Sequence, residues 1–326
     1  MSTIKVNAIE STSGGGVAAK LASINGGALS NRNLLHNSSY EIWQRGTTFA
    51  SAASNGSRYT ADRWSVPTRT KVTRSTDVPA GFKYAILLDR EQAGGSEPFT
   101  LSQGIEKDDI RFTGSYTLSF YAKSSDISSV NINVQDRTTV AEGGTNHSSI
   151  VTNQSISITS SWARYTHTFT LSSIALSGTC LRISIGNTAA SQHDELYLTG
   201  IQLETGSVAT EIEKKSLGEE LIRCFRFFEK FHVTAYVMQP SGNSGLNSET
   251  FYPYKARKRA AATVTLDGNL SLTLNGTNSN NTNFTLGGGN VDARVEGLHI
   301  AATITGSTFS SATLINNATF LADSEL

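Results

Sequence analysis

Two short acidic clusters hold the residues of this sequence best suited to breaking bonds. They are Glu106-Lys107-Asp108-Asp109 and His193-Asp194-Glu195. A glycan-cleaving enzyme needs two carboxyl groups that face each other across a cleft. Both clusters instead have the composition of solvated turns, where exposed acidic residues are ordinary surface. We therefore expect no catalytic residues.

Motifs for metals and cofactors are missing from the sequence. It has no Gly-x-Ser-x-Gly elbow, His-Glu-x-x-His pair, phosphate-binding loop or dinucleotide fingerprint. Its two cysteines, Cys180 and Cys224, cannot make a zinc site between them. We expect both to be buried free thiols, with a bridge between them as the alternative. No metal and no cofactor are expected.

Sugar binding needs aromatic rings beside amide and hydroxyl groups. Trp43, Trp64 and Trp162 stand in strand-like or motif positions, where core packing is the expected role. A loop context is better at Phe251-Tyr252-Pro253-Tyr254, near Asn243 and Asn247. Tyr252, Tyr254, Asn243 and Asn247 are therefore candidate glycan contacts, and strand-edge packing is the alternative for the two tyrosines.

The densest positive run is Lys255-Ala256-Arg257-Lys258-Arg259. Lys255, Arg257 and Arg259 could contact phosphates or acidic sugars of a bacterial envelope, or a carboxylate of a neighbouring subunit. A solvated strand edge, where cationic side chains block stray pairing, is the alternative that we favour.

The totals exclude several classes of protein. Lys plus Arg and Asp plus Glu are 27 each, so no net charge attracts nucleic acid or an anionic membrane. No signal-peptide core and no apolar run of membrane-spanning length occur, so we expect synthesis in a cytosol and no membrane insertion. A chain of 326 residues with 17% charged residues and 28 glycines favours two or three domains built from strands.

Strand-like alternation dominates residues 33–210. Nine candidate strands, separated by Gly, Asn, Ser and Asp, predict a two-sheet jelly roll. The alternation is clearest in Tyr116-Thr117-Leu118-Ser119-Phe120-Tyr121-Ala122. Residues 33–64 and 196–210 are predicted to supply the first and last strands, which should meet.

The period changes over residues 211–231. Apolar residues recur at three- and four-residue steps, and Ser216 with Glu219 makes a capping box, so this segment predicts one connecting helix. Its apolar side is too broad for one stripe, which predicts burial against both β-domains, neighbouring subunits, or both.

Residues 232–326 return to a period of two and predict a smaller β-domain of five to seven strands. Asp267-Gly268-Asn269 has the composition of a hairpin turn. Residues 1–32 hold few large apolar groups and many glycines, so this arm cannot bury enough surface to fold by itself. It is either an attachment segment or a disordered leader.

Four motifs occur in order along the chain. They are Ile42-Trp43-Gln44-Arg45-Gly46 with Tyr59-Thr60-Ala61-Asp62-Arg63-Trp64, then Gln202-Leu203-Glu204-Thr205-Gly206, then Gly218-Glu219-Glu220-Leu221, and finally Ala322-Asp323-Ser324-Glu325-Leu326. This series resembles a module of tail fibres and tail receptor-binding proteins of tailed bacteriophages, which is similar to the jelly roll of carbohydrate-binding modules.

The resemblance implies an all-β protein with a tail-attachment arm at 1–32 (Ile4, Val6 and Ile9), a jelly-roll β-sandwich at 33–210, a connecting helix at 211–231 and a C-terminal β-domain at 232–326. It also implies a virion location, contact with the tail tube, nozzle or adaptor proteins, and a homotrimer. Related jelly rolls often hold a structural calcium, and Glu41 matches one of its ligand positions. No carboxylate stands near Thr199-Gly200, where the second is expected, so calcium is not expected.

The leading hypothesis is therefore a non-enzymatic tail fibre or tail-tip protein that attaches to host surface glycans through many weak sites. A purely structural tail adaptor or collar subunit is the alternative, and a glycan-cleaving tailspike is a weaker one.

Overall fold

The computed structural model describes residues 31–91, 99–140, 145–187, 191–237, 246–267, 271–274, 277–279, 285–293, 295–304 and 313–325. None of the helices in these ranges combines the length and apolar character needed to cross a membrane.

A β-sandwich occupies the first two thirds of the chain. Its first sheet has the strand order β1-β4-β5-β12-β7-β10 and its second β2-β3-β6-β11-β8-β9. The strands are β1 (Thr48–Phe49), β2 (Ser57–Tyr59), β3 (Ser65–Pro67), β4 (Lys71–Ser75), β5 (Ala85–Asp89), β6 (Phe99–Glu106), β7 (Gly114–Lys123), β8 (Ser129–Arg137), β9 (Asn146–Ser157), β10 (Ala163–Leu171), β11 (Cys180–Asn187) and β12 (Glu195–Thr205), with a 3₁₀ turn, η1 (Lys107–Asp109), after β6. Because consecutive strands repeatedly change sheet, the sandwich is a jelly roll, as predicted.

Alternation along the strands explains the core. In β7, Tyr116, Leu118 and Phe120 point between the sheets and are almost fully buried. The alternate residues lie on the other side of the sheet, where Thr117 and Ser119 are also covered, and Tyr121 and Lys123 are partly exposed. Burying a large apolar side chain stabilises the fold by about 1.5–3 kcal/mol, and this core contains dozens of such residues.

The opening segment differs from its prediction. Residues 33–46 meet β12 as expected, since Leu34 donates to the Leu203 carbonyl at 2.9 Å. They form turns, not a strand, because the Asn37 side chain takes the bonds that a ladder would use: its Oδ1 accepts from Ile42 N at 3.0 Å and its Nδ2 donates to Ile42 O at 2.8 Å. Residues 33–46 thus hold no strand, and the first strands of the predicted opening segment 33–64 are β1 and β2.

The connecting helix α1 (Leu217–Phe225) is shorter than the predicted segment 211–231. It begins where the capping box placed it, with the Ser216 side chain accepting from Glu219 N. It ends early because Lys258 Nζ donates to the last carbonyl, that of Phe225, and Arg259 N donates to Arg226 O. Phe228 then starts a strand. Leu217 and Ile222 are more than half exposed, so the two β-regions of one chain do not bury the whole helix, and its burial against a neighbouring subunit stays a prediction.

The C-terminal part contains two further sheets. One has the strand order β13-β20-β16-β17, with β15 also pairing with β20, and the other has the order β14-β19-β18. The strands are β13 (Phe228–Val237), β14 (Leu246–Pro253), β15 (Thr263–Asp267), β16 (Ser271–Leu274), β17 (Thr277–Ser279), β18 (Thr285–Ala293), β19 (Gly297–Ile304) and β20 (Thr313–Asp323). β15 and β16 pair with successive stretches of β20, so they are not the two arms of a hairpin. The predicted turn at Asp267-Gly268-Asn269 is wrong in this respect.

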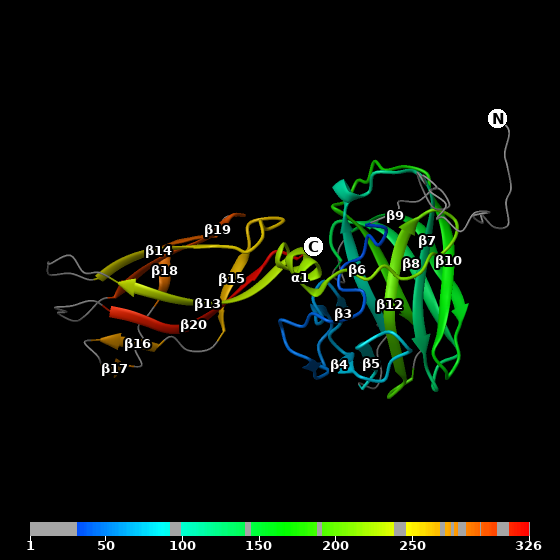
Figure 1. The fold of residues 1–326 in the computed structure, drawn as a ribbon, viewed down its shortest axis with the longest axis horizontal. Coiled ribbons are helices and arrows are strands. Elements are labelled where there is room, and N and C mark those ends of the chain that lie inside the picture. The colour runs from blue at the N-terminus through cyan, green and yellow to red at the C-terminus, as the bar shows by residue number, and fades with distance from the viewer. Residues whose placement is uncertain are drawn as a thin grey trace, which may run out of the picture.

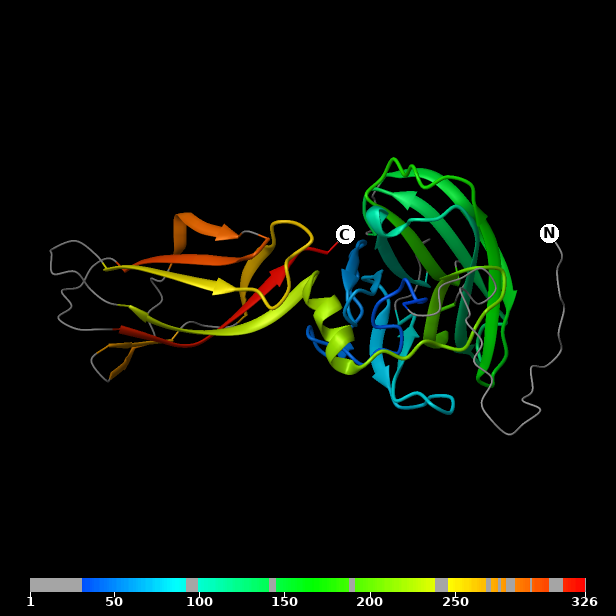
Figure 2. The ribbon, with the colours of Figure 1, turned by 45° about the horizontal axis from the view of Figure 1, so that its top comes forward.

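The sandwich and the C-terminal sheets lie end to end, with α1 between them (Figure 1). The view turned by 45° shows the same order, with the end of β20 reaching back to the sandwich (Figure 2). An all-β protein with a jelly-roll sandwich, one connecting helix and a smaller C-terminal β-region is therefore confirmed.

Candidate functional site

The two tyrosines predicted as glycan contacts in the C-terminal part differ in exposure. Tyr252 stacks on Phe231, with 4.2 Å between the ring centroids. Tyr254 is 8% exposed and packs edge-on against Phe231, so its prediction as a surface contact is wrong. Burial raises the pKa of its hydroxyl to about 12. Asn243 and the side chain of Asn247 lie outside the described residues.

The basic run divides into surface and interior. Lys255 and Arg257 are exposed, and Arg257 NH2 lies 3.6 Å from Glu296. Lys258 is fully buried and pairs with Glu229 at 3.0 Å. Arg259 donates to the carbonyls of Ser324 and Glu325 at 3.1 and 3.2 Å. The C-terminal segment of the same chain thus holds the Arg259 side chain, and the role of Arg259 as an anion contact stays a prediction.

The acidic clusters do not share a cleft. Glu106 pairs with Arg226 through two contacts of 2.8 and 2.9 Å beside α1. Glu195 starts β12, opposite Asp89 of β5, in the other sheet. No group of three or more His, Cys, Asp or Glu in the described ranges could hold a metal ion. Ile4, Val6 and Ile9 lie outside those ranges.

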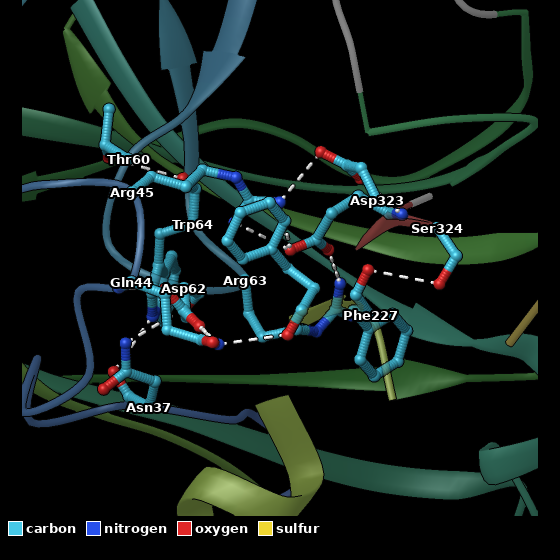
Figure 3. A network of polar contacts seen from close by, with 12 residues as sticks. Asn37, Gln44, Arg45, Thr60, Asp62, Arg63, Trp64, Phe227, Asp323 and Ser324 are labelled. Atoms are coloured by element: carbon cyan, nitrogen blue, oxygen red, sulfur yellow. Dashed lines mark hydrogen bonds and ion pairs between the residues drawn. The ribbon is translucent and has the colours of Figure 1, made fainter. Parts of the chain in front are cut away.

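The first and the last of the four sequence motifs meet beside Phe227 and Phe228 (Figure 3). We call this place the joint: Gln44, Arg45, Asp62, Arg63, Phe227, Phe228, Asp323, Ser324 and Glu325. Arg63 is 1% exposed. Its guanidinium pairs with Glu325, donates to the Gly104 carbonyl at 2.6 Å and lies 3.3 Å from the centroid of the Phe227 ring. One arginine thus ties the sandwich to α1 and to the last residues of the chain.

Arg45 repeats this arrangement beside it. Its guanidinium lies 3.5 Å from the centroid of the Phe228 ring, 3.0 Å from Asp323 and 3.5 Å from Glu325. Buried charges are stable only when they are paired and hydrogen-bonded, and each arginine here has both a carboxylate and an aromatic face.

Asp62 completes the joint from the sandwich side. It accepts hydrogen bonds from the backbone and side-chain amides of Gln44, and Gln44 also donates to the Phe228 carbonyl at 3.0 Å. Burial raises the pKa of Asp62 to about 6, although Arg45 and the Gln44 bonds act in the opposite direction. These motif residues therefore tie the sandwich to the C-terminal segment.

The three tryptophans separate by role. Trp64 lies in the core and Trp43 packs against it, as predicted. Trp162 precedes β10 on the outer side of the first sheet, where its indole nitrogen donates to Asp77 at 3.0 Å. The expected core role of Trp162 is wrong, and its position identifies a surface that the sequence did not reveal.

Trp162 belongs to what we call the aromatic face: Phe82, Tyr121, Trp162 and Tyr197, with Asp77 and Lys123. The rings form two pairs, Trp162 with Tyr197 at 6.3 Å and Phe82 with Tyr121 at 5.2 Å between centroids. Lys123 Nζ lies 5.5 Å from the Trp162 centroid and 4.9 Å from that of Tyr197, and it pairs with Asp77. All four rings are partly exposed.

The register of two neighbouring strands places these side chains together. Tyr197 of β12 lies opposite Lys123 of β7, and Thr199 lies opposite Tyr121. Gly200 sits at the irregularity that follows, with φ +57°. A Cβ at Gly200 would come within 2.5 Å of the Phe82 ring and 3.2 Å of the Tyr121 ring. Glycine therefore lets these two rings approach the sheet.

The electrostatics of the aromatic face suit polar ligands that carry no charge. Hydrogen bonds from Lys123 and then Trp162 lower the pKa of Asp77. Burial, followed by the nearby Glu195, raises the pKa of Tyr197 to about 12, so its hydroxyl remains protonated at neutral pH. The charges of Lys123 and Asp77 are paired with each other, so the partly exposed rings are the groups left for contact. Such a surface can bind the CH-rich face of a sugar without any bond-breaking step.

No protein-family model matches this chain, and no curated protein matches it either. Among solved structures, a xylan-binding domain, CBM22-1 of Xyn10C from Paenibacillus barcinonensis, is similar at 16% identity and a TM-score of 0.36, covering 54% of this chain and 96% of its own. The tandem CBM22-1-CBM22-2 domain of the same protein is similar at 14% identity and a TM-score of 0.35, covering 84% of this chain and all of its own (100%).

Proposed function

We propose that this protein binds glycans without cleaving them, through the aromatic face of its sandwich. The observation that carries the proposal is the set of four partly exposed rings beside Asp77 and Lys123. Partly exposed rings keep apolar area available for a ligand, while neighbouring polar groups fix its orientation.

The finer proposal is that the chain is an adhesin of a bacteriophage tail, a fibre or tail-tip protein that attaches to a host surface. Its support is the ordered series of motifs, whose arginines and carboxylates pair across the joint. A trimer would repeat the aromatic face three times and gain avidity from weak sites. The exposed Leu217 and Ile222 of α1 support an oligomer, because a neighbouring subunit would cover them.

A glycan array probed with the full chain tests the binding proposal. The expected result is a restricted set of bacterial surface saccharides, and Trp162→Ala should weaken their binding by about tenfold or more. Phe112→Ala is the matched control, since Phe112 is 63% exposed but lies outside the aromatic face. Equal loss in both variants, or no glycan bound by the wild type, would reject this site.

Native mass measurement and labelling of virions test the finer proposal. A trimer and antibody labelling at tail tips of particles from the producing strain are expected. A ring of six or twelve subunits would favour a structural adaptor instead, and the absence of the protein from purified virions would contradict a tail role.

A further inference from the structure

A groove of about 600 Å³ lies at the joint, between the sandwich and the C-terminal sheet. Arg45 lines it from the sandwich. From the C-terminal sheet come Lys230, Thr265, Asp267, Leu321 and Asp323. This volume falls within the range of small-molecule sites, which often occur at domain boundaries.

Strand register explains why these side chains share one surface. Lys230 of β13 and Thr265 of β15 both lie opposite Leu321 of the central strand β20. Two residues along, Thr263 and Phe228 both lie opposite Asp323. Because alternate residues of a strand point to the same side, these rows form one continuous floor. Gln44 and Arg45 close it at the sandwich end.

The charges of the groove are largely balanced before any ligand arrives. Lys230 pairs with Asp267 at 2.6 Å, and Arg45 with Asp323 at 3.0 Å. Glu325, the third carboxylate, pairs with Arg45 at 3.5 Å and with Arg63, so three cations balance three carboxylates. A phosphate or an acidic sugar would have to displace a carboxylate from its cation. A divalent cation would have to displace ammonium and guanidinium partners from the carboxylates.

The remaining groups match a ligand rich in hydroxyls. Thr263, Thr265 and Asp267 are exposed, and their oxygens offer donors and acceptors in a row along β15. Leu321 supplies an apolar patch between them. The Phe228 ring is covered by the Arg45 guanidinium and so gives no open stacking surface. Recognition here would rest on hydrogen bonds, in contrast to the stacking expected at the aromatic face.

We infer that this joint groove is a second saccharide site, which takes a neutral or amino sugar by hydrogen bonds to Thr263, Thr265 and Asp267. It is separate from the aromatic face and does not depend on glycan binding there. A sugar in the groove touches both the sandwich and the C-terminal sheet, so it stabilises their attachment by mass action.

Saturation-transfer NMR on the full chain tests the inference with D-galactose, D-glucosamine and D-glucuronic acid at about 10 mM, roughly ten times the dissociation constant of a weak site near 1 mM. Galactose or glucosamine should give a signal. Thr265→Trp, which fills the groove from an exposed strand position, should reduce that signal by at least fivefold. Thr170→Trp, on exposed β10 of the sandwich, is the matched control and should leave it unchanged.

Trp162→Ala separates the two sites, because it alters the aromatic face and leaves the groove intact. A signal lost in Thr265→Trp and kept in Trp162→Ala supports the groove. No signal from galactose or glucosamine, a signal from glucuronic acid alone, or a signal lost only in Trp162→Ala would overturn it.

Discussion

The joint and the aromatic face both place a cationic side chain beside aromatic rings and a carboxylate, but the two regions differ in burial. In the joint, Arg45 and Arg63 lie 3.5 and 3.3 Å above phenylalanine rings and pair with Asp323 and Glu325. On the aromatic face, Lys123 lies near two rings and pairs with Asp77. The difference is burial: Arg63 is 1% exposed, whereas the rings of the aromatic face are partly open.

Burial decides what such a group can do. In the joint, the partners of the arginines belong to the same chain: Arg63 donates to the Gly104 carbonyl and Arg45 to Asp323. On the aromatic face, the corresponding ring surface remains available to a partner. Changes in the joint should therefore act on stability, and changes on the aromatic face should act on binding.

The largest effect is expected for Arg63→Ala. It would leave Glu325 buried beside an empty space, and removing one partner of a buried pair costs about 3–5 kcal/mol. Urea unfolding measures this loss. Arg111→Ala, at an exposed arginine, should change the free energy of unfolding by less than about 0.5 kcal/mol. A loss of similar size in the two variants would mean that the joint is not a stabilising element.

A second effect depends on pH. The raised pKa of Asp62, about 6, means that the folded state holds a proton that the unfolded state releases. This contribution is fully present below the unfolded pKa of about 3.9 and is lost as pH rises through about 6. Between pH 7.5 and 4.5 the wild type should therefore gain about 2 kcal/mol relative to Asp62→Asn. Parallel urea midpoints of the two proteins over this range would contradict the assignment.

Gly200→Ala should lower both stability and glycan binding, because it changes the backbone beneath the aromatic face. The new Cβ would meet the Phe82 ring in a left-handed conformation, which costs about 1–2 kcal/mol. Glycan binding should fall with it. Gly218→Ala in α1, where no heavy atom lies within 4 Å, should instead stabilise by up to about 1 kcal/mol. If Gly200→Ala behaves like Gly218→Ala, the close approach of the two rings is not required.

The smallest effect on stability is expected for Trp162→Ala. The ring packs against Tyr197 on the surface, so its loss should cost no more than about 1 kcal/mol in urea unfolding. A loss above about 3 kcal/mol would show that Trp162 acts as a core residue, as the sequence alone suggested.

The sequence contained enough information for the fold. The alternation of Tyr116, Leu118 and Phe120 predicts β7 and its inward face, because strand period is a local property. The start of α1 is equally local, since Ser216 and Glu219 are three residues apart. Its end was not predictable, because Lys258 caps the Phe225 carbonyl from 33 residues away.

The functional surfaces depend on contacts between distant segments. Arg63 and Glu325 are 262 residues apart, and each is an ordinary charged residue when read alone. Trp162 precedes β10, so the alternation of that strand does not show which face of the sheet the Trp162 ring lies on. The hydrogen bond to Asp77, 85 residues earlier, places the ring on the outer face. Tyr254 misled for the same reason: its local sequence is that of a loop, but Phe231 covers it.

Hydrogen exchange of the full chain with and without a saccharide selected on the array tests the central claim most directly. The account predicts slower exchange in residues 116–123 and 195–203, the strands beneath the aromatic face, with little change in residues 217–229 of the joint. Protection confined to residues 246–259, or none in the sandwich while saccharide is bound, would contradict it.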